Sequence, residues 1–396
     1  MRQIYQNGRP VERSVDIDGD GRVDELVYYD ERGGIRESRH DLNKDGWMED
    51  IRLYRAGVLF ERKKDSNGDG RFDDVIRYKA KRPSLQKRDT NFDNKMDVFI
   101  HFNAAGLVKK VEEDTRHTGR VDRVKTYRGG KPVKVAYDAD GDGFKETATL
   151  FKNGTAWLQT QDNNRDGKPE VKIYYNPNGT RRKAESDTNS DGKFDTWEYY
   201  VQGKTVRLER DEGHKGRVNL KVFYKNGKKT RLIRDRDGDG RFEITRFFNR
   251  PPWSMVMELD TGGDGRPEGR YSYKKGVLRL KDVDEDSDGN VDFREHYDAQ
   301  GKLVKSEERH EARDRLDITW FYNGNEEAVR AEKDANGDGR VDIWFTYDKG
   351  RLVSVAEDTN ADGQPDVWEE YDESEALVKQ MKDMNYDGKP DVHKSF

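Results

Sequence analysis

The chain lacks cysteine altogether: none occurs among its 396 residues. Disulfide bonds and thiolate metal sites are therefore excluded. Long apolar runs are also absent, since no stretch approaches the roughly 18 residues that a membrane-spanning helix needs. Hydrophobic residues make up 32% of the chain and charged residues 39%, a balance that by itself would suggest disorder. A fold with so little to bury needs another source of stability, and bound metal ions are one.

Signatures of catalysis are missing too. The sequence contains no His-Glu-x-x-His pair, no glycine-rich phosphate loop and no nucleophile elbow. Carboxylate pairs are frequent, but the repeated loops described next account for them. We therefore expect a protein that is not an enzyme.

What the sequence does contain is a short acidic loop, Asp-x-Asp/Asn-x-Asp-Gly-x-x-Asp/Glu, which occurs sixteen times at a nearly constant spacing. The loops begin at Asp16, Asp41, Asp65, Asp89, Asp114, Asp138, Asp162, Asp187, Asp211, Asp235, Asp260, Asp284, Arg309, Asp334, Asp358 and Asp383. Self-similarity at a period of this size is typical of a protein built from one small repeated unit. We expect a single calcium-binding β-repeat domain over residues 1–396.

The stretch from Asp334 to Asp358 shows the anatomy of one unit. After the loop, alternate residues from Val341 to Tyr347 are apolar, which predicts a strand with one apolar face. The residues Asp348-Lys349-Gly350 predict a tight turn, and a second strand over 352–356 leads to the next loop. Each unit is therefore expected to be a β-hairpin followed by a cation loop.

An aromatic residue stands at position 14, counted from the loop start, in all sixteen units. Some units are longer than others by a single residue, and this difference falls after the aromatic, between it and the next loop. Loop and first strand are therefore expected to form a constant block, while the hairpin turn accepts an extra residue. The sequence predicts an all-β protein without helices.

Two architectures fit sixteen hairpins. In an open, superhelical or solenoid-like array each hairpin contacts only its neighbours, whereas an eight-bladed β-propeller would use two hairpins in each blade. The aromatic at position 14 occurs in every unit, which favours equivalent surroundings and hence the open array. The altered loops at Asp114, Asp211 and Arg309 recur every fourth unit and divide the chain into four blocks of about 98 residues. A superhelical turn and an ancestral duplication both explain this rhythm.

Thirteen loops have the oxygen side chains that a hard cation needs at the first, third, fifth and ninth positions, except that Gly262 stands at the third position of the loop from Asp260. Oxygen ligands alone favour calcium over zinc or copper, and the acid at the ninth position is expected to close the site. The predicted ligands of about thirteen calcium ions are Asp16, Asp18, Asp20, Asp24, Asp41, Asn43, Asp45, Glu49, Asp65, Asn67, Asp69, Asp73, Asp89, Asn91, Asp93, Asp97, Asp138, Asp140, Asp142, Glu146, Asp162, Asn164, Asp166, Glu170, Asp187, Asn189, Asp191, Asp195, Asp235, Asp237, Asp239, Glu243, Asp260, Asp264, Glu268, Asp284, Asp286, Asp288, Asp292, Asp334, Asn336, Asp338, Asp342, Asp358, Asn360, Asp362, Asp366, Asp383, Asn385, Asp387 and Asp391.

The three altered loops carry cationic residues instead. Lys215 and Arg313 occupy the fifth position, and the loop from Asp114 has Arg116 at the third. We expect these cations to replace the metal charge. Each altered loop also has a histidine, and a transition-metal site or binding stripe is the alternative interpretation of His117, His214 and His310.

Of the 80 acidic residues, 43 belong to the thirteen loops. Thirteen calcium ions would add 26 charges and change the formal net charge from −5 to +21. A basic surface favours anionic partners such as acidic polysaccharide, lipopolysaccharide or extracellular DNA. The chain begins inside a repeat, which suggests a trimmed mature protein or a segment lost from the front.

The stretches DTNSDGKFDTWEYY (187–200) and DTNADGQPDVWEEY (358–371) resemble bacterial secreted proteins and surface lipoproteins with tandem calcium-binding hairpin repeats. The loop is similar to those of dockerin, thrombospondin type 3 and integrin-type propellers, and the hairpin to tyrosine-aspartate and MORN-type repeats. The resemblance implies an extracellular or cell-envelope location and a scaffolding or adhesive role. A calcium-dependent binding module for anionic glycans, extracellular DNA or a cell-surface protein is the alternative.

Overall fold

The computed structural model describes residues 1–310 and 315–396, and in these ranges the chain consists of β-strands joined by turns and loops. The same ranges contain no helix long and apolar enough to cross a membrane. The contacts divide the chain into two compact units, Met1–Gly203 and Lys204–Phe396. Each unit is described by itself.

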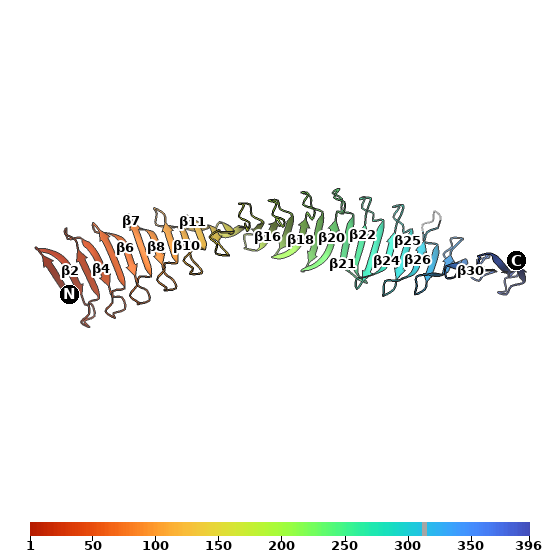
Figure 1. Cartoon of the computed structure of the whole chain (residues 1–396), viewed down its shortest axis with the longest axis horizontal. Helices are drawn as coiled ribbons and strands as arrows, with labels where there is room; N and C mark the ends of the chain where they lie inside the picture. The colour runs from red at the N-terminus through yellow and green to blue at the C-terminus, as the bar shows by residue number, and fades with distance from the viewer. Residues whose placement is uncertain (311–314) are drawn as a thin grey trace. The chain divides into compact units, whose positions relative to one another are not determined.

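The first unit contains seventeen strands, which follow one another side by side in chain order (Figure 1). They are β1 (Arg2–Gln6), β2 (Arg9–Val15), β3 (Glu25–Tyr29), β4 (Ile35–His40), β5 (Asp50–Arg55), β6 (Val58–Lys64), β7 (Asp74–Lys79), β8 (Arg82–Arg88), β9 (Val98–Phe102), β10 (Val108–Glu113), β11 (Arg123–Arg128), β12 (Lys131–Tyr137), β13 (Thr147–Lys152), β14 (Thr155–Gln161), β15 (Val171–Tyr175), β16 (Arg181–Ser186) and β17 (Thr196–Val201).

The second unit has sixteen strands in the same arrangement among its described residues. They are β18 (Lys204–Arg210), β19 (Leu220–Lys225), β20 (Lys228–Arg234), β21 (Ile244–Arg250), β22 (Trp253–Leu259), β23 (Gly269–Lys274), β24 (Val277–Val283), β25 (Phe293–Tyr297), β26 (Leu303–Glu308), β27 (Ile318–Tyr322), β28 (Ala328–Lys333), β29 (Ile343–Asp348), β30 (Arg351–Glu357), β31 (Val367–Tyr371), β32 (Leu377–Lys382) and β33 (Val392–Ser395).

Within each unit the strands form one open antiparallel sheet. Strand β4, for example, pairs with β3 before it and β5 after it, both antiparallel, and the same holds along the described chain. The described pairings show no division into four-stranded blades, so the predicted open hairpin array is confirmed and the propeller is not the fold. Because every connection joins adjacent strands, the acidic loops lie along one edge of each sheet and the hairpin turns along the other.

Two kinds of hairpin turn explain the two repeat lengths. The shorter units use a two-residue turn such as Ala56-Gly57, with φ of 48° and 75°. Most of the longer units use a longer turn that an Asp or Asn side chain caps. In the first of these, Oδ1 of Asp30 accepts the backbone N–H groups of Arg32 and Gly34 at 2.9 and 2.8 Å. The extra residue therefore lies in the turn, as the sequence predicts.

The buried groups of this protein are mainly charged. Among the described residues only six hydrophobic side chains are buried, whereas 29 polar or charged residues are. Of these 29, 24 stand at the first or ninth position of a loop. A single sheet covers neither of its own faces, so the apolar residues stay half-exposed and the loop edge becomes the best-protected part of each unit.

Long charged side chains cover much of the sheet faces. The Lys172 ammonium lies 4.8 Å from the centre of the Phe194 ring, a cation–π contact. Asp50 is fully buried and accepts hydrogen bonds from the guanidinium groups of Arg52 and Arg62 at 2.7 Å. Burial opposes ionisation of Asp50, but the two guanidinium groups outweigh it and lower its pKa. These contacts show how a chain of such low hydrophobicity can order a sheet.

Candidate metal centre

In the fifteen loops whose fourth and sixth residues are described, the backbone turns through two left-handed residues at these positions. In the loop from Asp138 these are Gly141 (φ +86°) and Gly143 (φ +100°). Glycine predominates at the sixth position because L side chains are strained at such angles. Glycine occupies the fourth position in only six of the sixteen loops. Other residues at this position are left-handed as well, as Lys44 and Phe92 are with φ of 67° and 62°. This second left-handed turn has no clear sequence signal, so the sequence did not predict it.

The first aspartate of each loop is the acceptor that closes the turn. Oδ1 of Asp138 accepts the backbone N–H of Gly141 at 2.5 Å, and Oδ2 accepts that of Gly143 at 2.9 Å. Asp138 is only 2% exposed. Burial opposes its ionisation, but these two donors and the nearby guanidinium of Arg116 outweigh burial and hold the pKa of Asp138 below its ordinary value. The carboxylate is therefore ionised at neutral pH.

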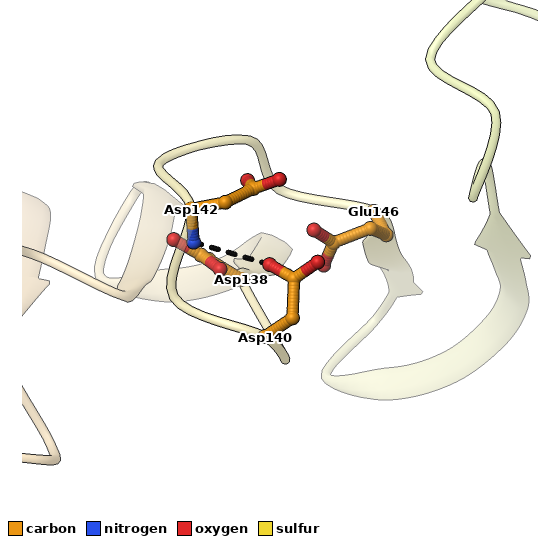
Figure 2. Close-up of side chains that lie close together, drawn as sticks. All are labelled: Asp138, Asp140, Asp142 and Glu146. Carbon is orange, nitrogen blue, oxygen red and sulfur yellow. Dashed lines mark hydrogen bonds between the residues drawn. The ribbon is translucent and has the colours of Figure 1, made fainter.

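The other carboxylates of this loop also give oxygens to the backbone. Oδ1 of Asp140 accepts the N–H of Asp142 at 3.1 Å, and Oδ1 of Asp142 accepts the N–H two residues further on at 2.8 Å. Oε2 of Glu146 accepts the N–H of Ala139 at 2.9 Å. Figure 2 shows the side chains of Asp140, Asp142 and Glu146 gathered with that of Asp138 around one space inside the loop.

In several loops the predicted ligands converge closely enough to hold one metal ion. One oxygen from each member of a set lies within 4.8 Å of the others. The sets include Asp138, Asp140, Asp142 and Glu146; Asp235, Asp237, Asp239 and Glu243; Asp16, Asp18 and Asp24; Asp41, Asp45 and Glu49; and Asp162, Asp166 and Glu170. All four positions meet in the loops from Asp138 and Asp235, whereas the set from Asp16 leaves out Asp20, the fifth residue.

Four of the five ninth-position glutamates carry an oxygen without a partner, whereas Oε1 of the fifth, Glu268, accepts the N–H of Gly262 at 2.9 Å. Oε1 is buried and makes no hydrogen bond in Glu49, Glu146, Glu170 and Glu243, and these residues are between 4% and 9% exposed. A buried carboxylate oxygen without a partner is costly. A cation bound among the loop carboxylates would supply the missing partner, so the residues present fit a hard, oxygen-binding metal.

In some loops that end in aspartate, side chains of the same loop donate to the ninth residue. The hydroxyl of Thr90 donates to both oxygens of Asp97 at 2.9 Å, and the amide of Asn336 donates to Oδ1 of Asp342 at 2.9 Å. A cation would have to displace such bonds. The remaining predicted ligands keep the same loop positions, and most first and ninth residues are buried.

In one altered loop, a cation of the chain contacts the loop's own acid. In the loop from Asp114, Nε of Arg116 lies 3.3 Å from Oδ2 of Asp122, the ninth residue. The same guanidinium donates to the backbone carbonyl groups of Asp138 and Ala139 at 3.2 and 3.1 Å. Arg116 therefore links its own loop to the next one.

The other two altered loops begin at Asp211 and Arg309. In the loop from Asp211, Asn219 replaces the ninth acid, and its Oδ1 still accepts the N–H of Glu212 at 2.8 Å. Arg313, predicted to replace a metal charge, lies outside the described residues. Of the three histidines, His117 has Nδ1 3.5 Å from Asp97, the ninth residue of the preceding loop.

Successive loops are also joined directly. Within each unit, the backbone N–H of a loop's first residue donates to the carbonyl of the preceding loop's ninth residue, as Asp41 does to Asp24 at 2.9 Å. Seventh-position side chains reach the next loop: Nη1 of Arg22 donates to the carbonyl of Asp45 at 2.8 Å. Sequence reasoning missed this role because the seventh position lies outside the ligand pattern.

Comparisons with known proteins add little to this geometry. No protein-family model matches the chain, and no curated protein matches it. The chain is similar to solved structures of the TcdB2-TccC3 complex, of that complex with Cdc42, and of a form without its hypervariable C-terminal region. Identity is 9–10% and the TM-score 0.11–0.12, over 94–99% of this chain. The chain spans 28–30% of the length of those chains, and TM-scores this low carry no functional argument.

Proposed function

We propose that this protein is a non-enzymatic scaffold of the cell surface or extracellular space that calcium makes rigid. The observation that carries the proposal is the partnerless, buried Oε1 of Glu146 beside three further carboxylates. The equivalent glutamates of three other loops repeat it. Calcium would be held by the first, third, fifth and ninth residues of a loop.

Calcium is the cation that this ligand set favours. The converging groups are carboxylates without sulfur or imidazole, which argues against zinc and copper. Calcium accepts six to eight oxygens in flexible geometry, whereas magnesium requires a tight octahedron and usually keeps its waters. Extracellular modules bind calcium with dissociation constants of about 10⁻⁴–10⁻³ M, so an extracellular location suits a chain of many exposed loops.

The position of the loops favours a structural role for the ions. Each loop joins the second strand of one hairpin to the first strand of the next, as the 16–24 loop joins β2 to β3. Its buried carboxylates repel one another unless a cation neutralises them. Bound ions would therefore stabilise each hairpin against its neighbour, and the array could serve as a structural or adhesive element.

Calcium binding can be counted directly. Native mass spectrometry of the whole chain, titrated with calcium, is expected to show at least twelve bound ions, about one for each of the thirteen loops with the ligand pattern. Magnesium at the same concentration should bind fewer ions, since it seldom gives up its waters for an all-protein site. A chain that binds no calcium, or binds magnesium equally well, would contradict the proposal.

Binding of an anionic polymer is the second candidate function. Its supporting observation is a cluster of exposed Lys225, Lys228 and Lys229 at the β19–β20 turn, on the edge opposite the loops. With calcium bound, the formal charge would change from −5 to +21, which would attract polyanions. Retention on an acidic polysaccharide column is expected to require calcium and to fall with rising salt. Replacing these three lysines by glutamine should weaken retention, and salt-independent retention would exclude this function.

A further inference from the structure

One of the four loops with acids at every ligand position already contains a cation supplied by the chain. The loop begins at Asp284, and Arg309 is the first residue of the following loop. Nη2 of Arg309 donates to Oδ2 of Asp286 at 2.8 Å, and Nη1 donates to Oδ2 of Asp288 at 3.0 Å. Nη2 also contacts the carboxylate of Asp292. The guanidinium therefore touches the third, fifth and ninth residues together.

The burial of Arg309 separates this contact from an ordinary surface ion pair. Its side chain is 11% exposed, although its partners Asp286 and Asp288 are 57% and 39% exposed. A guanidinium keeps its charge at any physiological pH and presents five donors in a fixed plane. It can therefore engage several carboxylates at once, as a metal ion does, in the space between them.

The backbone of Arg309 makes the same hydrogen bond as the backbone of a first-position aspartate in another loop. Its N–H donates to the carbonyl of Asp292 at 2.8 Å, the same link that Asp41 makes to Asp24. Only the side chain differs: every other loop has aspartate here, folded back onto its own loop. The arginine at this position therefore leaves its own loop without the aspartate that closes the turn, and its side chain lies as a cation in the preceding loop.

Other cations that reach back to a preceding loop make weaker contacts. Nζ of Lys44 lies 2.9 Å from Asp18 alone, and the side chain of Lys44 is 54% exposed. Arg165 contacts Asp142 and lies 3.7 Å from Asp140, with 48% of its side chain exposed. Among the ion pairs of the described residues, neither cation pairs with a ninth-position acid.

We propose that the guanidinium of Arg309 is the resident cation of the Asp284 loop and keeps calcium from binding there. The inference rests on the proposed calcium binding of the other loops. Calcium would have to displace Arg309 from three carboxylates, so this loop should remain without calcium at concentrations that fill the loops from Asp138 and Asp235. The chain should then bind twelve calcium ions and not thirteen.

Counting ions in two variants tests the assignment. By native mass spectrometry, R309A should bind one calcium ion more than the unmodified chain, because the Asp284 loop becomes available. The matched control is R165A, which removes an exposed arginine and should leave the count unchanged. Equal counts in R309A and the unmodified chain would overturn the inference while leaving the proposed function intact.

A measurement without metal keeps the two proposals separate. As EDTA removes calcium, amide hydrogen exchange in β24 and β25 should accelerate less than in β20 and β21, because the Asp284 loop keeps its cation and the Asp235 loop does not. R309A should abolish that difference, and R165A should not. If no variant binds calcium, the proposed function fails and this exchange pattern still decides the role of Arg309. Equal exchange with and without Arg309 would overturn that role.

Discussion

Chelation by EDTA is expected to unfold or greatly loosen the protein. Without the proposed calcium ions, the 39 acids of the twelve loops other than the Asp284 loop would lose their counter-charge, and 19 of these carboxylates are buried. An ion bound only by the folded state contributes about 2.7 kcal/mol when its concentration is 100 times the dissociation constant. Twelve such sites, with the Asp284 loop left out, have an upper limit of ~32 kcal/mol, since coupled sites do not add freely. Far-UV circular dichroism and the thermal midpoint, followed as calcium is removed, measure the effect.

Two controls make this result specific. Excess calcium should restore the spectrum, because unfolding by ion removal is reversible linkage. Raising the salt concentration without calcium should restore much less, since screening weakens repulsion but supplies no ligand for buried oxygens such as Oε1 of Glu243. A spectrum and thermal midpoint that EDTA leaves unchanged would refute a structural role for calcium.

The second large effect is expected from replacing one anchoring aspartate, Asp235→Ala. Asp235 is 2% exposed and accepts the N–H groups of Gly238 and Gly240 at 2.6 and 2.9 Å. Its loss leaves two donors without partners, at a cost of about 1–3 kcal/mol, and also removes a ligand of one proposed calcium site. Amide exchange in β20 and β21, which flank the loop, should therefore accelerate strongly, and calcium should no longer slow it.

Asp211→Ala is the matched control, because Asp211 has the same backbone role in a loop with a lysine at the fifth position. Its oxygens accept the N–H groups of Lys215 and Gly216 at 3.1 and 2.5 Å, and it is 4% exposed. Asp211→Ala should lose only the two hydrogen bonds that close the turn. Its effect on the free energy of local unfolding should therefore be the same at low and saturating calcium. If both variants respond to calcium equally, the Asp235 loop has no ion that the Asp211 loop lacks.

The repeated hairpin could be predicted from the sequence because its signals are local. Alternating apolar residues, turn glycines and a constant distance from loop to aromatic each depend on residues close together in the chain. The same is true of the clustered ligands in the loop from Asp138, since a nine-residue loop with a fixed turn allows few arrangements. The extra residue of the longer units was also placed correctly, in turns such as that at Asp30.

Features that depend on contacts between loops could not be predicted. Arg309 looked like a lost aspartate, and only the arrangement of successive loops shows that its side chain enters the preceding one. The link from Arg22 to Asp45 has the same origin, because a seventh-position side chain has no partner within its own loop. The bond from Thr90 to Asp97 competes with metal in a way that ligand spacing does not reveal.

The replacement of apolar burial by charge burial has a thermal consequence. Unfolding raises heat capacity chiefly by exposing apolar surface to water, and here only six hydrophobic side chains of the described residues are buried. The heat-capacity change should therefore be small for a chain of this length, and the curve of stability against temperature should be shallow. Cooling, which weakens hydrophobic association, should have little effect on such a protein. The range of conditions in which the protein stays folded would be set more by the concentration of dissolved divalent cations than by temperature.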